Sequence, residues 1–306
     1  MEHTVRLANE NDIGNLLELI NLIQPHVPWD EKILRWQFFD GPGGPARVYI
    51  VEVEKRIVAQ YVAVPYEINI SIDEIAVAWM IQDVMTHPDF RGQGILHALG
   101  KRCLDEIRDS QAYGFTFPNE KSAGSFRRNG WTRLCSVPFR SVEMESTVAK
   151  HGPNKLIEVD SASDLEIPSL PTQFGVKRDV EYLNWRYGKP GQIYRMFHAS
   201  TGYVILKRYE SDGDAILHIC DLVVQNDESV SDVLEQVYSV AKQSGAKVVT
   251  AWLTDGHPYA ESFNASGLSL ADELPVSVYV TGPQKADPTL AQAARWHITH
   301  GDSDVY

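Results

Sequence analysis

The sequence predicts an α/β protein in which one fold occurs twice along the chain. The first observation is an apolar strand that enters a glycine-bearing turn and continues into a helical pattern, over residues 83–107. The second is a set of landmarks that recurs in the same order in the second half. The third is the length of 306 residues, which is enough for two domains of ordinary size.

The first half alternates strand and helix patterns, each identified by its apolar period and its flanking turn residues. Asn11 and Asp12 precede the first helix as caps, and a Gly/Pro turn at 41–45 follows the second. In chain order we first predict a strand at 4–8, a helix with apolar positions Ile13, Leu16, Leu17 and Ile20, and a helix at 30–38. A hairpin at 48–52 and 57–65 comes next. The strand, turn and helix of 83–107, a strand at 113–117 and a helix at 122–129 follow it.

The second half repeats these landmarks in order. The pairs are Asp30 and Trp36 with Asp179 and Trp185, Pro42 and Gly43 with Pro190 and Gly191, and Asp83 with Asp221. The distance from the shared Asp to a glycine after the last helix is 47 positions in the first half (130 − 83) and 46 in the second (267 − 221). Four echoes in order predict a tandem duplication.

The turn Arg91-Gly92-Gln93-Gly94 has the features of an anion-binding site. Glycines let the backbone approach a ligand closely, and a helix N-terminus adds free N–H donors and a positive dipole end. Two common phosphate motifs do not fit. The dinucleotide fingerprint needs a third glycine where His97 stands, and no Lys-Ser or Lys-Thr follows the turn as a P-loop requires.

Residues 91–96, Arg-Gly-Gln-Gly-Ile-Leu, resemble the [RQ]-x-x-G-x-[GA] loop of the GNAT acyltransferases, with Leu96 in place of the last Gly or Ala. In that family the loop amides bind the pyrophosphate of acetyl-CoA. The resemblance therefore implies acetyl-CoA as cosubstrate and no metal. The implied contacts on this strand and loop are Met85, Thr86, Arg91, Gly92, Gln93, Gly94, Ile95 and Leu96.

A second GNAT segment lies downstream, where Asn119 and Gly130 are 11 positions apart as in N-x-x-A-x-x-x-Y-x-x-x-G-F. Ser122 replaces the family's Ala. Phe126 stands where many members carry a Tyr that protonates the leaving thiolate, and a phenyl ring has no such proton. The resemblance adds Asn119 and Phe126 to the cofactor-binding residues.

The resemblance also implies the architecture of two tandem GNAT-like folds, each a central mixed β-sheet flanked by helices. We predict a GNAT domain at 1–145, a linker at 146–178 and a degenerate GNAT-like domain at 179–306. The second copy has Asn-Asp-Glu-Ser-Val at 226–230 in place of the loop, without glycines and with two acids that would repel a pyrophosphate. The sequence thus predicts one CoA site, in the first domain.

The reaction implied by the resemblance is acyl transfer from the CoA thioester to an amine. A backbone N–H near Met85 or Thr86 would polarise the thioester carbonyl, and a base must take a proton from the amine. Asp83 is the nearest carboxylate on the strand, although the matching Asp221 favours a structural role. The C-terminal carboxylate of Tyr306 is a second candidate, because some GNAT relatives use a terminal carboxylate as base.

Composition limits the partners. A net charge of −13 disfavours nucleic acid, whose binding needs a basic face. Three cysteines without a C-x-x-C, no signal-peptide pattern and no long apolar run predict a cytoplasmic protein without disulfides, zinc or a membrane span. We expect a small amine acceptor, such as an amino sugar, antibiotic or amino-acid-like molecule, and homo-oligomers are compatible with the sequence.

Two alternative functions remain open. One is a non-catalytic acyl-CoA sensor or interaction module on the same fold, which the Phe at position 126 favours. The other is an aminoacyl-tRNA-dependent transferase, which would need no CoA loop at all. The intact loop at 91–96 favours the acetyltransferase over both.

Overall fold

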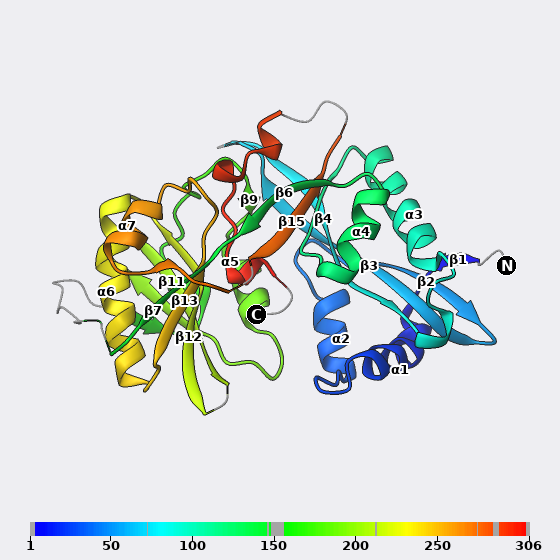
Figure 1. Cartoon of the computed structure of the whole chain (residues 1–306), viewed down its shortest axis with the longest axis horizontal. Coiled ribbons are helices and arrows are strands. Elements are labelled where there is room, and N and C mark those ends of the chain that lie inside the picture. The colour runs from blue at the N-terminus through cyan, green and yellow to red at the C-terminus, as the bar shows by residue number, and fades with distance from the viewer. Residues whose placement is uncertain are drawn as a thin grey trace. The chain divides into compact units, whose positions relative to one another are not determined.

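A computed structural model describes residues 4–71, 73–145, 147, 156–211, 213–273, 275–283 and 288–303. The chain divides into two compact units, which Figure 1 shows with their helices and strands. The segments of unit 1 are Met1–Glu67, Ala76–Leu134 and Ser277–Ala291, and those of unit 2 are Ile68–Ile75, Cys135–Val276 and Gln292–Tyr306.

Unit 1 is built on a mixed sheet with the strand order β1-β2-β3-β4-β5-β15-β6. Strands β4 and β5 run parallel, whereas β1–β2, β2–β3 and β5–β15 are antiparallel. The strands are β1 (Val5–Leu7), β2 (Arg47–Val53), β3 (Arg56–Asn69), β4 (Ile75–Thr86), β5 (Tyr113–Thr116), β6 (Thr132–Val137) and β15 (Val276–Thr281).

Four helices cover this sheet: α1 (Ile13–Ile23), α2 (Glu31–Phe38), α3 (Ile95–Asp109) and α4 (Glu120–Arg128). Figure 1 shows the α1–α2 pair and the α3–α4 pair on opposite sides of the sheet. Apolar residues at helical spacing bury one face of α3, where Leu99, Cys103 and Ile107 pack with Trp79 and Ile81 of β4. This packing holds α3 against β4.

Unit 2 repeats the plan with a sheet in the order β14-β7-β13-β12-β11-β10-β8. Here β12 and β13 are the parallel pair, as β4 and β5 are in unit 1. The elements are β7 (Phe139–Glu143), β8 (Ile157–Val159), β10 (Arg195–Ala199), β11 (Gly202–Ser211), β12 (Asp214–Val224), β13 (Val248–Trp252), β14 (Ser269–Leu270), α5 (Val180–Tyr187), α6 (Asp227–Gln243) and α7 (Ala260–Ala265). The short β9 (Gly175–Val176) pairs with the end of β3.

The predicted α/β fold with two mixed sheets is confirmed, and the predicted strands and helices occur within a few residues of their expected bounds. None of the helices in the described part of the chain is long and apolar enough to cross a membrane.

The two sheets exchange strands between the halves of the sequence, and the predicted domain boundaries differ from the observed division for this reason. Strand β15, from the second half of the sequence, pairs with β5 in unit 1. Strand β7, from the first half, lies between β13 and β14 in unit 2. The predicted linker at 146–178 also differs, since its described part holds β8 and β9, both in unit 2.

Candidate active site

Strand β5 pairs along its whole length with the middle of β4. Their parallel register runs from Ala78 with Tyr113 to Ile81 with Thr116, and β5 ends there while β4 continues to Thr86. The Thr116 hydroxyl donates to the Ile81 carbonyl at 2.9 Å and closes the shared ladder. Beyond this point no strand in the described part of the chain pairs with the edge of β4 that faced β5. Such an edge presents backbone groups that can bind a ligand.

The backbone of β4 changes conformation just after the ladder ends. Asp83 has a φ of 47°, in the left-handed region that non-glycine residues seldom adopt. The buried Gln60 of β3 donates from Nε2 to the Asp83 carbonyl at 3.1 Å. On the β3 side pairing continues, because the His87 amide donates to the Val58 carbonyl at 2.8 Å.

The turn that follows β4 exposes its backbone amides. Gly92 and Gly94 have φ values of 76° and 78°, and Gly94 is the N-cap of α3. A Cβ added at either glycine would meet nothing within 4 Å, so their requirement is conformational. Among the described residues, no acceptor takes a hydrogen bond from the backbone amides of residues 92–97. Unpaired amide donors and the positive end of a helix dipole are the features that favour an anion at such a turn.

Two side chains of the turn donate hydrogen bonds to backbone carbonyls that precede it. Arg91 donates from Nε to the Thr86 carbonyl at 3.2 Å, which ties the turn to the end of β4. Gln93 reaches back to the Asp89 carbonyl at 3.4 Å. Arg91 is exposed, so its guanidinium adds a positive charge beside the free amides.

The structure places the predicted cofactor residues in two groups. Residues 91–94 are exposed on the turn, whereas Met85, Thr86 and Ile95 are buried and Leu96 is half-buried beneath it. The Thr86 Oγ1 is buried, and within the described residues it makes no hydrogen bond. The exposed turn thus follows directly on the buried end of β4.

The second predicted segment lies on and under α4. Asn119 is exposed and caps the helix, because its side chain accepts from the Ser122 amide at 3.0 Å. Phe126 is buried in the core, where its ring centroid lies 6.1 Å from that of Tyr61 and 5.6 Å from that of Trp131. Tyr306 lies outside the described residues.

Sequence reasoning missed two buried carboxamides beside this site. Gln60 and Gln82 are 0% and 5% exposed, although each stands within an apolar strand. Such a polar residue is the sequence signal that was available, because buried amides are retained where they make a specific contact. Gln60 makes one to Asp83. Neither side-chain atom of Gln82 finds a partner among the residues that the structure describes.

The equivalent region of unit 2 differs in each respect. The side chain of Asn226 accepts from the Ser229 amide at 3.0 Å and so caps α6 itself. Asp221 matches Asp83 and lies at a register shift of the β11–β12 pair, but its carboxylate is buried and bonded to Arg178 at 2.8 Å. Asp221 is thus a structural residue, and the N-terminus of α6 is occupied by its own cap.

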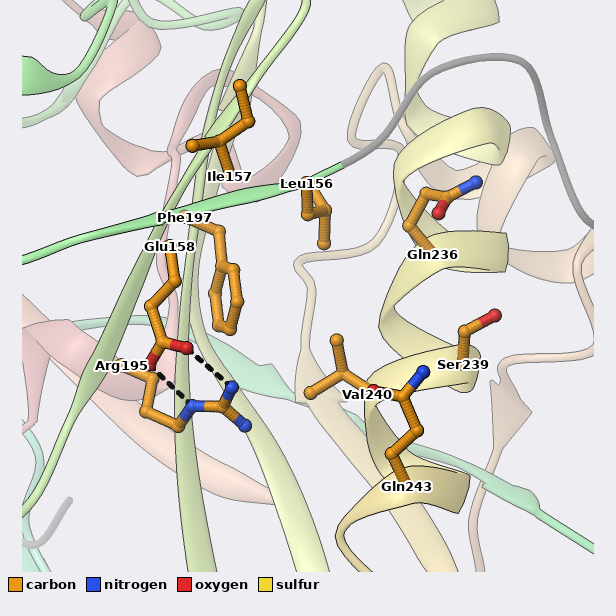
Figure 2. Close-up of a pocket in the computed structure, with 9 residues that line it drawn as sticks. All are labelled: Leu156, Ile157, Glu158, Arg195, Phe197, Gln236, Ser239, Val240 and Gln243. Atoms are coloured by element: carbon orange, nitrogen blue, oxygen red, sulfur yellow. Dashed lines mark hydrogen bonds and ion pairs between the residues drawn. The ribbon is translucent and has the colours of Figure 1, made fainter.

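A pocket of about 390 Å³ also occurs in unit 2, between α6 and the strands β8 and β10 (Figure 2). Its one cation, Arg195, is paired with Glu158 by two hydrogen bonds of 2.7 Å. Its other lining groups are apolar residues, amides and a hydroxyl, which offer no base or anion site. Among the described residues, no cluster of His, Cys, Asp or Glu could hold a metal ion.

Unit 1 combines a parallel β4–β5 pair, in which β4 is the longer strand, with an open glycine turn before α3. Residues 4–134 match the family described as Acetyltransferase (GNAT) domain, and this part of the chain is a GNAT domain. The match ends before β7, so it covers the N-terminal landmarks and not the second copy.

Solved structures share the fold of the whole chain. A probable N-acyltransferase from Enterococcus faecalis superposes with a TM-score of 0.70 at 14% identity, covering 92% of this chain and 72% of that one. A GCN5-related N-acetyltransferase from Anabaena variabilis gives 0.66 at 14% identity, covering 91% and 72%. The Saccharomyces cerevisiae N-myristoyltransferase with bound myristoyl-CoA gives 0.59 at 9% identity, covering 92% and 83%. No curated protein matches the sequence.

Proposed function

We propose that unit 1 is an N-acetyltransferase that moves an acetyl group from acetyl-CoA to a primary amine of a small molecule. The observation that carries the proposal is the set of backbone amides at residues 92–97, which donate no hydrogen bond among the described residues. They follow the part of β4 that extends beyond the last residue of β5. The amides of the turn and Arg91 would bind the pyrophosphate. Acetyl-CoA, when bound, supplies the activated thioester.

The protein's own contribution is position and polarisation. The end of β4 near Met85 and Thr86 has backbone groups on its open edge, so an amide there would donate to the thioester oxygen as negative charge develops. Holding the amine against the thioester removes most of the entropy cost of a bimolecular step. Asp83 or the terminal carboxylate of Tyr306 would take the proton from the amine.

Phe126 limits what the protein can do for the leaving group. Its ring is buried and carries no hydroxyl, so it protonates nothing. A thiolate is a tolerable leaving group, because an ordinary thiol has a pKa of about 8.5. The reaction thus needs a base for the amine more than an acid for the thiolate.

The acceptor we propose is a small amine, such as an amino sugar, an antibiotic or an amino-acid-like molecule. The net charge of −13 supports a cationic acceptor over a nucleic acid. The buried Phe126 favours one second candidate, an acyl-CoA sensor that binds without turnover. Release of free thiol from acetyl-CoA in the presence of a panel of amines separates the enzyme from the sensor.

The first prediction concerns Gly94→Glu. Acetyl-CoA at about 100 times its Kd should raise the Tm of the wild type by roughly 5 °C or more. Gly94→Glu should abolish this rise, because the new carboxylate repels the pyrophosphate and a side chain at this positive φ strains the turn. The measurement is a thermal shift assay with and without acetyl-CoA.

Gly191→Glu is the matched control. Gly191 has a φ of 74°, is exposed and has open space around its Cβ position, so it carries the same charge and strain away from the loop. This variant should keep the full rise. A wild type whose Tm does not respond to acetyl-CoA would contradict both the transferase and the sensor.

A further inference from the structure

We propose that Gln60 is a positioning residue, which holds Asp83 in its left-handed conformation and so aims the β4 amides at the bound thioester. The inference rests on the proposed function, since it assumes that acetyl-CoA binds to unit 1. It assigns to a buried amide on β3 a role in the polarisation of the thioester carbonyl.

The contact itself is specific. Gln60 is 0% exposed, and its Nε2 donates to the Asp83 carbonyl at 3.1 Å across the β3–β4 pair. A buried carboxamide is costly unless it is hydrogen-bonded, and this bond satisfies the Gln60 Nε2, whereas its Oε1 makes no hydrogen bond within the described residues. The bond takes up a backbone carbonyl at the position where the strand departs from regular geometry.

Asp83 needs such support. Its φ of 47° is unfavourable for a residue with a Cβ, and such conformations persist only where the surroundings enforce them. The chain is fixed on both sides of it. The Thr116 hydroxyl holds the Ile81 carbonyl at 2.9 Å, and the His87 amide pairs with Val58 at 2.8 Å. Gln60 provides the contact between these two fixed points.

The conformation at Asp83 decides where the following amides point. A single residue in the left-handed region bends the strand. It also changes which face of the sheet each later side chain points to, and which edge each later backbone amide points to. Met85 and Thr86 lie within three residues of Asp83, on the part of β4 beyond its last partner in β5. Oxyanion donors act only when they are held at the right place, so loss of the support should weaken polarisation before it weakens binding.

The neighbouring Gln82 provides a matched control. It has the same side chain, is 5% exposed, lies next to Asp83 and makes no side-chain hydrogen bond within the described part of the chain. Replacing it by Met removes a buried amide of the same size without removing a contact to the backbone of residue 83. A general effect of losing a buried carboxamide would appear in both variants.

The test is infrared spectroscopy of acetyl-CoA labelled with ¹³C at the thioester carbonyl, bound to the folded protein. In the wild type and in Gln82→Met the carbonyl stretch should move to lower wavenumber on binding. In Gln60→Met most of this shift should be lost, while the Kd for acetyl-CoA changes by less than about threefold because the turn is intact. Its kcat should fall roughly tenfold with little change in KM.

A rescue variant distinguishes positioning from general damage. Glycine adopts a positive φ without steric cost, so Asp83→Gly in the Gln60→Met background should restore the infrared shift. The readout precedes attack by the amine and does not depend on the Asp83 carboxylate. Gln60→Asn, whose amide is too short to reach, replaces Gln60→Met if the latter does not fold.

Three results would count against the inference. An unchanged carbonyl shift in Gln60→Met, or an equal loss in Gln82→Met, overturns it and leaves the proposed function standing. Failure of Asp83→Gly to restore the shift also overturns it. Absence of acetyl-CoA binding by the wild type overturns the proposed function, and this inference with it.

Discussion

Replacing Arg178 by Met is expected to destabilise unit 2 by about 3–5 kcal/mol. The Arg178 side chain is 1% exposed and pairs with two buried carboxylates, those of Asp221 at 2.8 Å and Asp302 at 2.9 Å. Its remaining donors reach the Val176 carbonyl and the Thr299 hydroxyl. Without the guanidinium, two negative charges would remain in a region from which water is excluded.

The electrostatics explain why the effect is large. Burial by itself would raise the pKa of Asp221, but Arg178 and His297 outweigh it and hold this pKa well below its usual range. Burial would likewise lower the pKa of Arg178, and the two carboxylates raise it far above the ordinary value. Each charge is therefore stable in the interior only because its partners are there.

Arg195→Met is the control in the same unit. Arg195 pairs with Glu158 through two bonds of 2.7 Å, but both side chains are more than a third exposed. Loss of such a pair costs about 1 kcal/mol or less. Urea unfolding followed by hydrogen exchange of β12 peptides measures unit 2 by itself. Equal losses in the two variants would show that the buried network is not a special source of stability.

Lowering the pH from 7 to 4 should destabilise unit 2 by about 3 kcal/mol through His218 alone. Burial, with a smaller contribution from Lys207, lowers the pKa of His218 to about 4. Burial also lowers the pKa values of His257 and His300 well below the ordinary range. All three histidines are neutral in the folded protein, within a few ångströms of other buried rings.

The direction of the effect follows from proton uptake. In the unfolded chain each of these histidines takes up a proton near pH 6.5, whereas in the folded protein it takes up the proton only near its lower pKa. Stability is therefore full above about pH 6.5 and falls as the pH decreases toward 4. The low pKa of Asp221 acts below this window, because its unfolded value is 3.8.

His218→Gln tests the assignment. Gln keeps a polar group toward Thr250, whose hydroxyl lies 2.6 Å from the His218 Nδ1, but it cannot titrate. Its free energy of unfolding should decline less between pH 6.5 and 4 than that of the wild type. His26→Gln, at an exposed position in unit 1, is the control for loss of a histidine outside unit 2. A His218→Gln profile parallel to the wild type would contradict the prediction.

Local sequence was sufficient for the elements and for the open turn. The glycines at 92 and 94 fit the two positive φ values of the loop, and Asp30 and Asn119 each cap the helix that follows them. Asp12 is the N-cap of α1, as predicted, but its side chain makes no cap bond. These features depend on neighbours a few residues apart, so short patterns carry the information. The recurrence of Asp83 as Asp221 likewise marked an irregular point in a central strand of each sheet.

Asp83 and Asp221 show which contacts a local sequence pattern cannot predict. Asp221 is bonded to Arg178, 43 residues away, and Asp83 is supported by Gln60, 23 residues away. The motif around each Asp is similar, yet one carboxylate lies in a buried ion network and the other residue is held through its backbone carbonyl. Pairs at this separation depend on strand register, which no short pattern determines.

The sequence by itself determined the duplicated α/β plan, the glycine-bearing turn at 91–94 and the absence of a tyrosine at position 126. Only the tertiary structure decided that β7 and β15 each complete the sheet of the other half, and that β4 continues past β5 with Asp83 held by Gln60. The physical reason is that an apolar strand of five or six residues fits several sheet edges equally well. The choice among them depends on hydrogen bonds and packing from the whole unit.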